Sequence, residues 1–229
     1  MMDVKCFTMI KHILLATLCA GRLLAQDAEF KPIFNGKDFD GWWGLGTEDP
    51  AKWMALPAEK LTEKKEKSLE DIKKHWKVVD GVLVNDGSGL YLTTEKNYAD
   101  FELKLEYKHG ANADSGIYLR AIPQVQIWDI AGKHGDAKKG SGGLWNNPGG
   151  SKGRDPLVVA DNPVGEWNTI YIRLVGDKVT VRLNDKLVVD EAPLQNYFDK
   201  AGPLPKTGPI QLQTHGAEIH WRNVMVKEL

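Results

Sequence analysis

Apolar and polar residues alternate through much of the chain after residue 75, and this two-residue period predicts β-strands. The clearest case is the segment 101–108, where Phe, Leu, Leu and Tyr alternate with Glu and Lys. Turn-forming pairs such as Asp80-Gly81 separate the alternating segments. Many short strands joined by turns are typical of an antiparallel β-sandwich. The strands we predict include residues 33–34, 101–108, 116–121, 124–129, 167–175, 178–183, 186–189, 210–214 and 218–228.

One segment has helical character instead. Residues 58–75 are rich in Glu, Lys and Leu, which favour helices, and Pro57 fits a helix start. Leu61, Leu69 and Ile72 form only a narrow apolar stripe, so this helix is expected on the surface. The predicted fold class is therefore all-β, a two-sheet antiparallel sandwich with one surface helix near residues 58–75.

The N-terminus has the pattern of a secretory signal peptide. Lysines flank an apolar run at residues 13–20, and the small residue Ala25 precedes the expected cleavage point. We therefore predict a signal peptide at residues 1–25 and a single domain at residues 26–229. The domain is expected to be exported, either to the periplasm or to the medium.

Both cysteines, Cys6 and Cys19, lie in the predicted signal peptide, so the mature domain would contain none. Cys19 raises the alternative of a lipoprotein. Leu18 does not match the small residue that lipoprotein processing prefers, so lipidation is not expected. The apolar run is too short for a transmembrane helix, and no membrane span is expected after signal removal. A buried N-terminal helix is the remaining alternative.

Composition mainly excludes classes of protein. The 229 residues suit one domain with a full core, and a formal net charge of −1 does not favour nucleic-acid binding. The six histidines form no HxH or HExxH cluster, and no run of oxygen ligands suits calcium. We therefore predict no metal and no cofactor.

Polar and aromatic residues share one face of three predicted strands, because side chains alternate between the two faces of a strand. A solvated sheet face is usually rich in Lys, Glu and Thr, whereas this face has amides and aromatic rings. Such a surface suits a sugar, which offers hydroxyl groups at its rim and a C–H face for stacking. The residues expected on this face are Tyr118, Arg120, Gln124, Gln126, Trp128, Gln211, Gln213 and His215.

A Gly- and Lys-rich loop follows the second of these strands. Residues 133–152 contain little that is apolar besides Leu144 and Trp145, so we expect a flexible rim rather than core. Trp145 and Asn146 would close over a bound sugar. Asp114, before Ser115-Gly116, is expected to be a turn residue.

Ordered segments across nearly the whole predicted domain resemble the 3-keto-disaccharide hydrolase family. They include FNGKDFDGWW, WKVVDGVLVNDG, DSGIYLR, QVQIWD and GPIQLQTHGAEIHWRNVMVKEL. The resemblance implies a concanavalin A-like jelly-roll sandwich and a glycosidase acting on sugars that carry a ketone at C3. Many family members have an acidic residue where this chain has Gln124, so a catalytic carboxylate cannot be carried over to that position.

The chemistry of a C3 ketone suggests roles for three residues. The ketone acidifies the C2 hydrogen, so a base can remove it, the glycosidic oxygen leaves C1 by elimination, and water then adds. Such a site needs a base, a donor to the leaving oxygen and a group at the ketone oxygen. We assign Asp129 as the base. Arg120 would stabilise the enolate oxygen or bind sugar hydroxyls, and His215 would be a donor or an acid–base group. As alternatives, Asp129 caps the following loop, Arg120 pairs with Glu102 or Glu106, and His215 is only a turn residue.

The predicted function is a secreted hydrolase of 3-keto-glycosides or 3-keto-disaccharides, supplied with oxidised sugar by an upstream sugar 3-oxidoreductase. The alternative is a non-catalytic carbohydrate-binding module, because the same fold serves binding alone. An ordinary glucanase is the weaker interpretation, since the acidic strand motif of such enzymes is absent. The predicted substrate-binding residues are Tyr118, Gln124, Gln126, Trp128, Trp145, Asn146 and Gln213; their alternative role is to line a solvated sheet.

Overall fold

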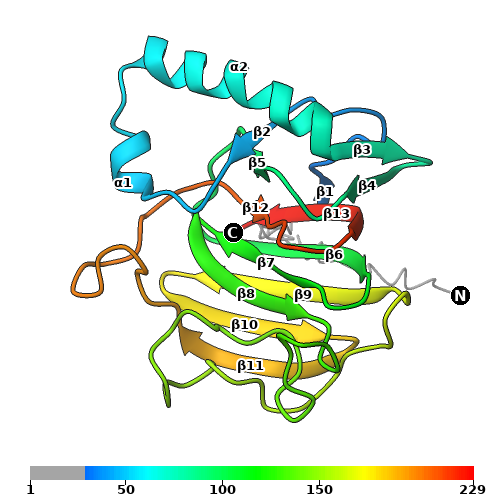
Figure 1. Cartoon of the computed structure of the whole chain (residues 1–229). Helices are drawn as coiled ribbons and strands as arrows, with labels where there is room; N and C mark the ends of the chain where they lie inside the picture. The colour runs from blue at the N-terminus through cyan, green and yellow to red at the C-terminus, as the bar shows by residue number, and fades with distance from the viewer. Residues whose placement is uncertain (1–28) are drawn as a thin grey trace, which may run out of the picture.

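The computed structural model describes residues 29–229, so the predicted signal peptide and both cysteines lie outside the described residues. The described part is a sandwich of two antiparallel β-sheets (Figure 1). This arrangement confirms the predicted fold class. No helix within residues 29–229 is long and apolar enough to cross a membrane.

The larger sheet has eight strands. Its order is β11-β10-β9-β6-β13-β4-β3, with β1 paired to β13. In β6 the strict alternation seen in the sequence buries the apolar residues and leaves Lys104 exposed. The strands are β1 (Lys31–Pro32), β3 (Trp76–Val79), β4 (Val82–Asn85), β6 (Phe101–His109), β9 (Asn168–Val175), β10 (Lys178–Leu183), β11 (Lys186–Pro193) and β13 (Ile219–Glu228).

The smaller sheet has five strands in the order β2-β5-β12-β7-β8. Every residue of β8 is buried, in contrast to the alternation of exposure in β6. One face of this sheet adds Ile117, Val125 and Leu212 to the main core between the sheets. The opposite, outer face therefore presents buried polar residues. The strands are β2 (Trp42–Leu45), β5 (Tyr91–Thr94), β7 (Asp114–Leu119), β8 (Ile122–Trp128) and β12 (Gln211–Leu212).

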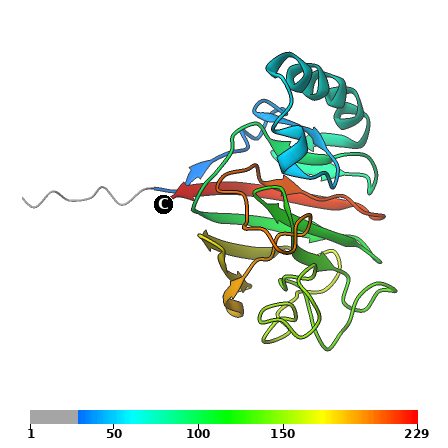
Figure 2. The same cartoon turned by 90° about the vertical axis from the view of Figure 1, so that its left-hand side faces the viewer.

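Helix α2 (Ala58–His75) has the predicted bounds and lies across the top of the sandwich (Figure 1). It contacts β2 and β3, which are the edge strands at the same end of the two sheets. Its Ile72 side chain is fully buried in the main core. The helix therefore closes one open edge of the sandwich. Figure 2 shows α2 and the loops after β8 at opposite ends of the molecule.

Three details differ from the sequence prediction or extend it. Helix α1 (Pro50–Trp53), a single turn capped by Asp49, was not predicted. The strand expected at residues 33–34 is instead β1, at residues 31–32, where it pairs with β13. Trp42 and Trp43 face opposite ways, because neighbouring residues in a strand point to opposite faces of the sheet. Trp42 enters the main core, and Trp43 packs on the outer face of the smaller sheet.

Candidate functional site

Two glutamines and an aspartate form a hydrogen-bonded chain on the outer face of the smaller sheet. Gln124 Nε2 donates to Gln126 Oε1, and Gln126 Nε2 donates to Asp114 Oδ1 at 2.8 Å. Gln126 Nε2 also lies 3.0 Å from the carbonyl oxygen of Ser115 and 3.1 Å from that of Ile127. Gln124 and Gln126 are only 5% and 2% exposed. The sequence prediction that these amides share one face is confirmed.

The partners of Gln126 determine which way both amides point. A carboxylate and two carbonyl groups accept hydrogen bonds but cannot donate them, so they must face the nitrogen of Gln126. The oxygen of Gln126 must then face Gln124, which presents its own nitrogen. Gln124 Oε1 therefore points away from Gln126 as an acceptor.

Asp114 joins this chain to His215 at the surface. Asp114 Oδ2 lies 3.2 Å from His215 Nδ1, and the two side chains are 24% and 61% exposed. Asp114 is the first residue of β7, opposite Trp128 in β8, and not the turn residue that we expected. Sequence reasoning therefore missed Asp114, although its even spacing from Gly116 and Tyr118 already placed it on the polar face.

Gly116 lets the amides lie directly over the middle of β7. A Cβ atom at Gly116 would lie 2.9 Å from the Val125 carbonyl oxygen, 3.0 Å from Gln124 Cδ and 3.1 Å from Gln213 Oε1. Gln213 Oε1 and Gln211 Oε1 belong to the buried side-chain atoms of the described residues that have no hydrogen-bond partner. Buried acceptors without a donor are costly, so they favour a ligand that supplies hydroxyl groups.

Tyr118 and Tyr91 border the amides on the side of α1. Thr47 Oγ1 lies 2.8 Å from the Tyr118 hydroxyl oxygen and 3.2 Å from that of Tyr91. The two rings pack edge to face with centroids 5.5 Å apart. Burial, reinforced by the nearby Tyr91, raises the pKa of Tyr118 well above its usual value. Tyr118 thus stays neutral and acts through hydrogen bonding and packing; Thr47 was not predicted from the sequence.

Trp128 and Trp145 border the amides on the opposite side. Their ring centroids lie 4.9 Å apart in an edge-to-face arrangement, and Trp128 Nε1 donates to the Gly140 carbonyl at 2.9 Å. The Arg154 guanidinium lies 4.1 Å from the centroid of Trp145 and occupies one face of that ring. Next to it, Asn146 Oδ1 is a further buried acceptor without a partner among the described residues.

The centre of the loop at residues 133–152 is part of the core, so the prediction of a flexible rim is wrong there. Gly142 N donates to Gln126 O at 2.7 Å, and Gln126 N donates to Gly143 O at 2.9 Å. Leu144 forms a bridge with Val125 and is fully buried. The loop thus pairs with β8, which would otherwise be a free sheet edge.

Arg120 does not lie on the polar face, contrary to the prediction. It occupies the two-residue turn between β7 and β8 with a positive φ of 54°, so strand alternation does not apply to it. Its guanidinium binds Asp100 at 2.7 Å, and neither Glu102 nor Glu106 is its partner. The guanidinium also donates to three carbonyl groups, those of Ala99, Gly176 and Pro205. Burial lowers the pKa of Arg120, and the ion pair with Asp100 opposes that shift.

Asp129 is likewise engaged outside the polar face. It follows β8, and its Oδ2 accepts from Asn112 N at 2.8 Å while its Oδ1 accepts from Ala131 N at 3.0 Å. Its carboxylate therefore holds two turns together, which is the loop-capping alternative considered above. The structure brings His215 to the amide network but neither Arg120 nor Asp129.

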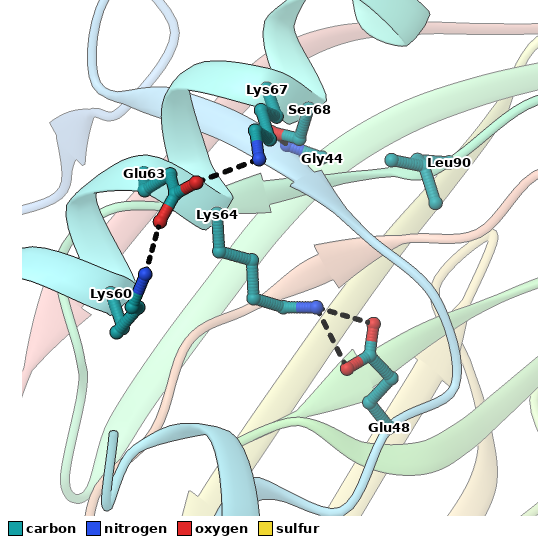
Figure 3. Close-up of a pocket in the computed structure, with 8 residues that line it drawn as sticks. All are labelled: Gly44, Glu48, Lys60, Glu63, Lys64, Lys67, Ser68 and Leu90. Atoms are coloured by element: carbon teal, nitrogen blue, oxygen red, sulfur yellow. Dashed lines mark hydrogen bonds and ion pairs between the residues drawn. The ribbon is translucent and has the colours of Figure 1, made fainter. Parts of the chain in front are cut away.

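A separate groove of about 450 Å³ lies beneath the N-terminal half of α2 (Figure 3). Each of its charged side chains has an ion-pair partner: Glu63 pairs with Lys60 and Lys67, and Glu48 pairs with Lys64. This pairing makes it a weaker candidate than the amide network. Within residues 29–229, no three His, Cys, Asp or Glu side chains are grouped closely enough to hold a metal ion.

Two solved structures of candidate glycosyl hydrolases from Parabacteroides distasonis ATCC 8503 have a similar fold. One has a TM-score of 0.62 and 23% sequence identity, with 89% of this chain and 84% of the other covered. The second has a TM-score of 0.60 and 23% identity, with 87% of this chain and 94% of the other covered.

The sequence has relatives that agree with the resemblance noted above. A 3-keto-disaccharide hydrolase of Bacteroides thetaiotaomicron is 27% identical, and the alignment covers 90% of this chain and 81% of the relative. Residues 29–227 match the family described as 3-keto-alpha-glucoside-1,2-lyase-like domain. The predicted family is thereby confirmed, and the prediction of a glycosidase agrees with it. The chain belongs to the 3-keto-alpha-glucoside-1,2-lyase-like domain family.

Proposed function

We propose that this protein hydrolyses glycosides whose sugar carries a ketone at C3, and that the sugar binds on the outer face of the smaller sheet. Family membership and the name of the Bacteroides relative support the reaction class. One observation carries the location: the buried oxygens of Gln211 and Gln213 lack donors. Sugar hydroxyl groups are donors of the kind that these acceptors require.

The reaction balances without a redox step. A base takes the C2 proton, the electrons form an enolate, and the C1–O bond breaks as the aglycone leaves with a proton. Water then adds across C1 and C2, giving a 3-keto sugar and a free alcohol. The aglycone oxygen and the ketone oxygen each gain from a hydrogen-bond donor during elimination.

His215 is the group that we assign as the base. It is exposed, its Nδ1 lies 3.2 Å from a carboxylate oxygen of Asp114, and Asp114 is the last residue of the amide chain. An imidazole is well suited to proton transfer near neutral pH. The hydroxyls of Thr47 and Tyr91, at the border of the amides, are candidate donors to the leaving oxygen. We no longer assign Arg120 and Asp129 to the reaction, because their polar atoms are bound elsewhere.

We also propose that the protein works after export, together with an oxidoreductase that produces the ketone. The predicted signal peptide supports export. An ordinary glucoside lacks the acidic C2 hydrogen, so the substrate must first be oxidised at C3. The chain itself needs no redox group for the steps described above.

The proposal can be tested with p-nitrophenyl 3-keto-glucosides and the corresponding unoxidised glucosides, as both anomers. Release of p-nitrophenol from the keto compounds alone, above a buffer blank, is the expected result. His215→Ala should lower kcat by roughly 10²-fold or more, the usual contribution of a positioned acid or base. Turnover of the unoxidised glucosides would instead show an ordinary glycosidase.

The carbohydrate-binding module remains the second candidate, since fold does not decide function. Calorimetry with the same sugars separates the two. Binding of a keto-glucoside without release of p-nitrophenol would overturn the hydrolase and support the binding module. Absence of both binding and release would refute the carbohydrate site itself.

A further inference from the structure

We propose that Asp114 is a positioning residue that holds His215 in one tautomer, with Nε2 as the atom that accepts the C2 proton. The proposal rests on the proposed function and adds to it the reacting atom and the group that selects it. Asp114 itself need not touch the substrate.

The orientation of the Asp114 carboxylate is fixed from the buried side. Its Oδ1 accepts from Gln126 Nε2 at 2.8 Å, and Gln126 is itself held by two backbone carbonyl groups. Gln124 completes the chain by donating to Gln126 Oε1. Since both glutamines are buried, rotating the carboxylate would break a network that water cannot easily replace.

This orientation leaves Asp114 Oδ2 facing His215. The distance from Oδ2 to His215 Nδ1 is 3.2 Å. An ionised carboxylate has no hydrogen to donate and repels a nitrogen lone pair, so this close contact favours the tautomer with hydrogen on Nδ1. In a neutral imidazole with Nδ1 protonated, the lone pair is on Nε2. The carboxylate thus determines which nitrogen can act as a base.

Exposure is consistent with this division of roles. The His215 side chain is more than twice as exposed as that of Asp114, so the imidazole can reach a substrate while the carboxylate stays behind it. A nucleophile or base oriented by a third group is a recurrent arrangement in catalytic sites. An ordinary surface ion pair, in contrast, contributes little to stability and has no effect on chemistry.

Asp114→Asn is the informative change. It keeps an oxygen that can accept from Gln126, and it replaces the oxygen that faces His215 by an NH₂ group, which is a donor. Gln126 still donates, so the side-chain oxygen of the introduced asparagine must face Gln126 and its NH₂ group must face His215. Nδ1 then becomes an acceptor, and the hydrogen moves to Nε2, where it blocks the base. We expect kcat to fall roughly 10²-fold with little change in KM, less than the about 10⁴-fold loss in a buried triad.

Two measurements on the same samples test the proposal. Nitrogen-15 NMR of the imidazole ring should show hydrogen on Nδ1 in the parent protein and on Nε2 in the Asp114→Asn variant. Turnover of a 3-keto-glucoside should fall in that variant. Glu218→Gln is the matched control, because Glu218 Oε1 lies 2.6 Å from His220 Nε2 on β13 of the other sheet. This control should leave turnover unchanged.

The outcomes separate this proposal from the proposed function. Parental turnover in Asp114→Asn, with the tautomer reversed, would overturn the role of the tautomer. If the hydrogen lies on His215 Nε2 in the parent protein, Asp114 does not set the tautomer as proposed. If the parent protein releases no aglycone from any keto-glucoside, the proposed function fails, while the NMR measurement still decides whether Asp114 sets the tautomer.

Discussion

Replacing Gln124 by glutamate is the sharpest test of the amide network. Gln124 presents its nitrogen to Gln126 Oε1, and turning that oxygen away would remove Gln126 Nε2 from the three acceptors around it. A carboxylate at position 124 would set two acceptor oxygens against each other in a buried site. The introduced carboxyl must therefore be protonated, or Gln126 must rotate and lose its bonds.

The magnitude follows from the burial of this position. Gln124 is 5% exposed, and a buried carboxyl without a donor commonly gains two or more pKa units. A rise of about two units corresponds to about 2.7 kcal/mol at neutral pH. Because the pKa of the introduced carboxyl is higher in the folded protein than in the unfolded chain, the folded protein binds more protons between the two values. The variant should therefore match the parent most closely near pH 4 and lose stability as the pH rises.

Urea unfolding of parent and Gln124→Glu at pH 4 and pH 8 measures this difference. Gln195→Glu, on the loop after β11, makes the same chemical change at a position outside the amide network and should show little pH dependence. An equal free-energy difference between parent and Gln124→Glu at both pH values would refute the argument. It would mean that Gln126 adapts to a carboxylate and that its orientation is not fixed.

Three further predictions concern the surroundings of the site. Gly116→Ala places a methyl group against Gln124 and Gln213, so KM for the keto-glucoside should rise; Gly149→Ala, with nothing within 4 Å, should leave KM unchanged. Leu144→Ala should lower the free energy of unfolding by about 2–4 kcal/mol, measured with urea, because the side chain is fully buried; a change below about 1 kcal/mol would restore the flexible-rim prediction. Arg120→Ala should lower the free energy of unfolding by about 3 kcal/mol and leave turnover per folded molecule unchanged. A loss of turnover without a loss of stability would instead indicate a catalytic role for Arg120.

Strand alternation predicted much of the polar face correctly. Gln124, Gln126 and Trp128 share that face because each lies two residues from the next within one strand. The bounds of α2 were also predicted correctly, because its residues have a strong helix propensity of their own.

The prediction failed where strands begin and end. Arg120 lies in a hairpin turn and Asp129 lies beyond β8, so the parity rule no longer fixes where their side chains point. Their hydrogen-bond partners are distant in sequence, and no local pattern identifies them. Asp114 was expected in a turn but lies in a strand. Its turn propensity is outweighed by its pairing with Trp128 and its hydrogen bond to Gln126, both on the neighbouring strand β8.

The bonds of Arg120 also bear on the kinetics of folding. Its guanidinium joins carbonyl groups that are 21, 56 and 85 residues away in sequence. Those bonds require the turn between β9 and β10 and the loop before β12 to be in place, so the entropy of closing long loops must be paid first. Contacts that form after the folding transition state slow unfolding without speeding refolding. We therefore expect Arg120→Ala to raise the unfolding rate more than it lowers the folding rate.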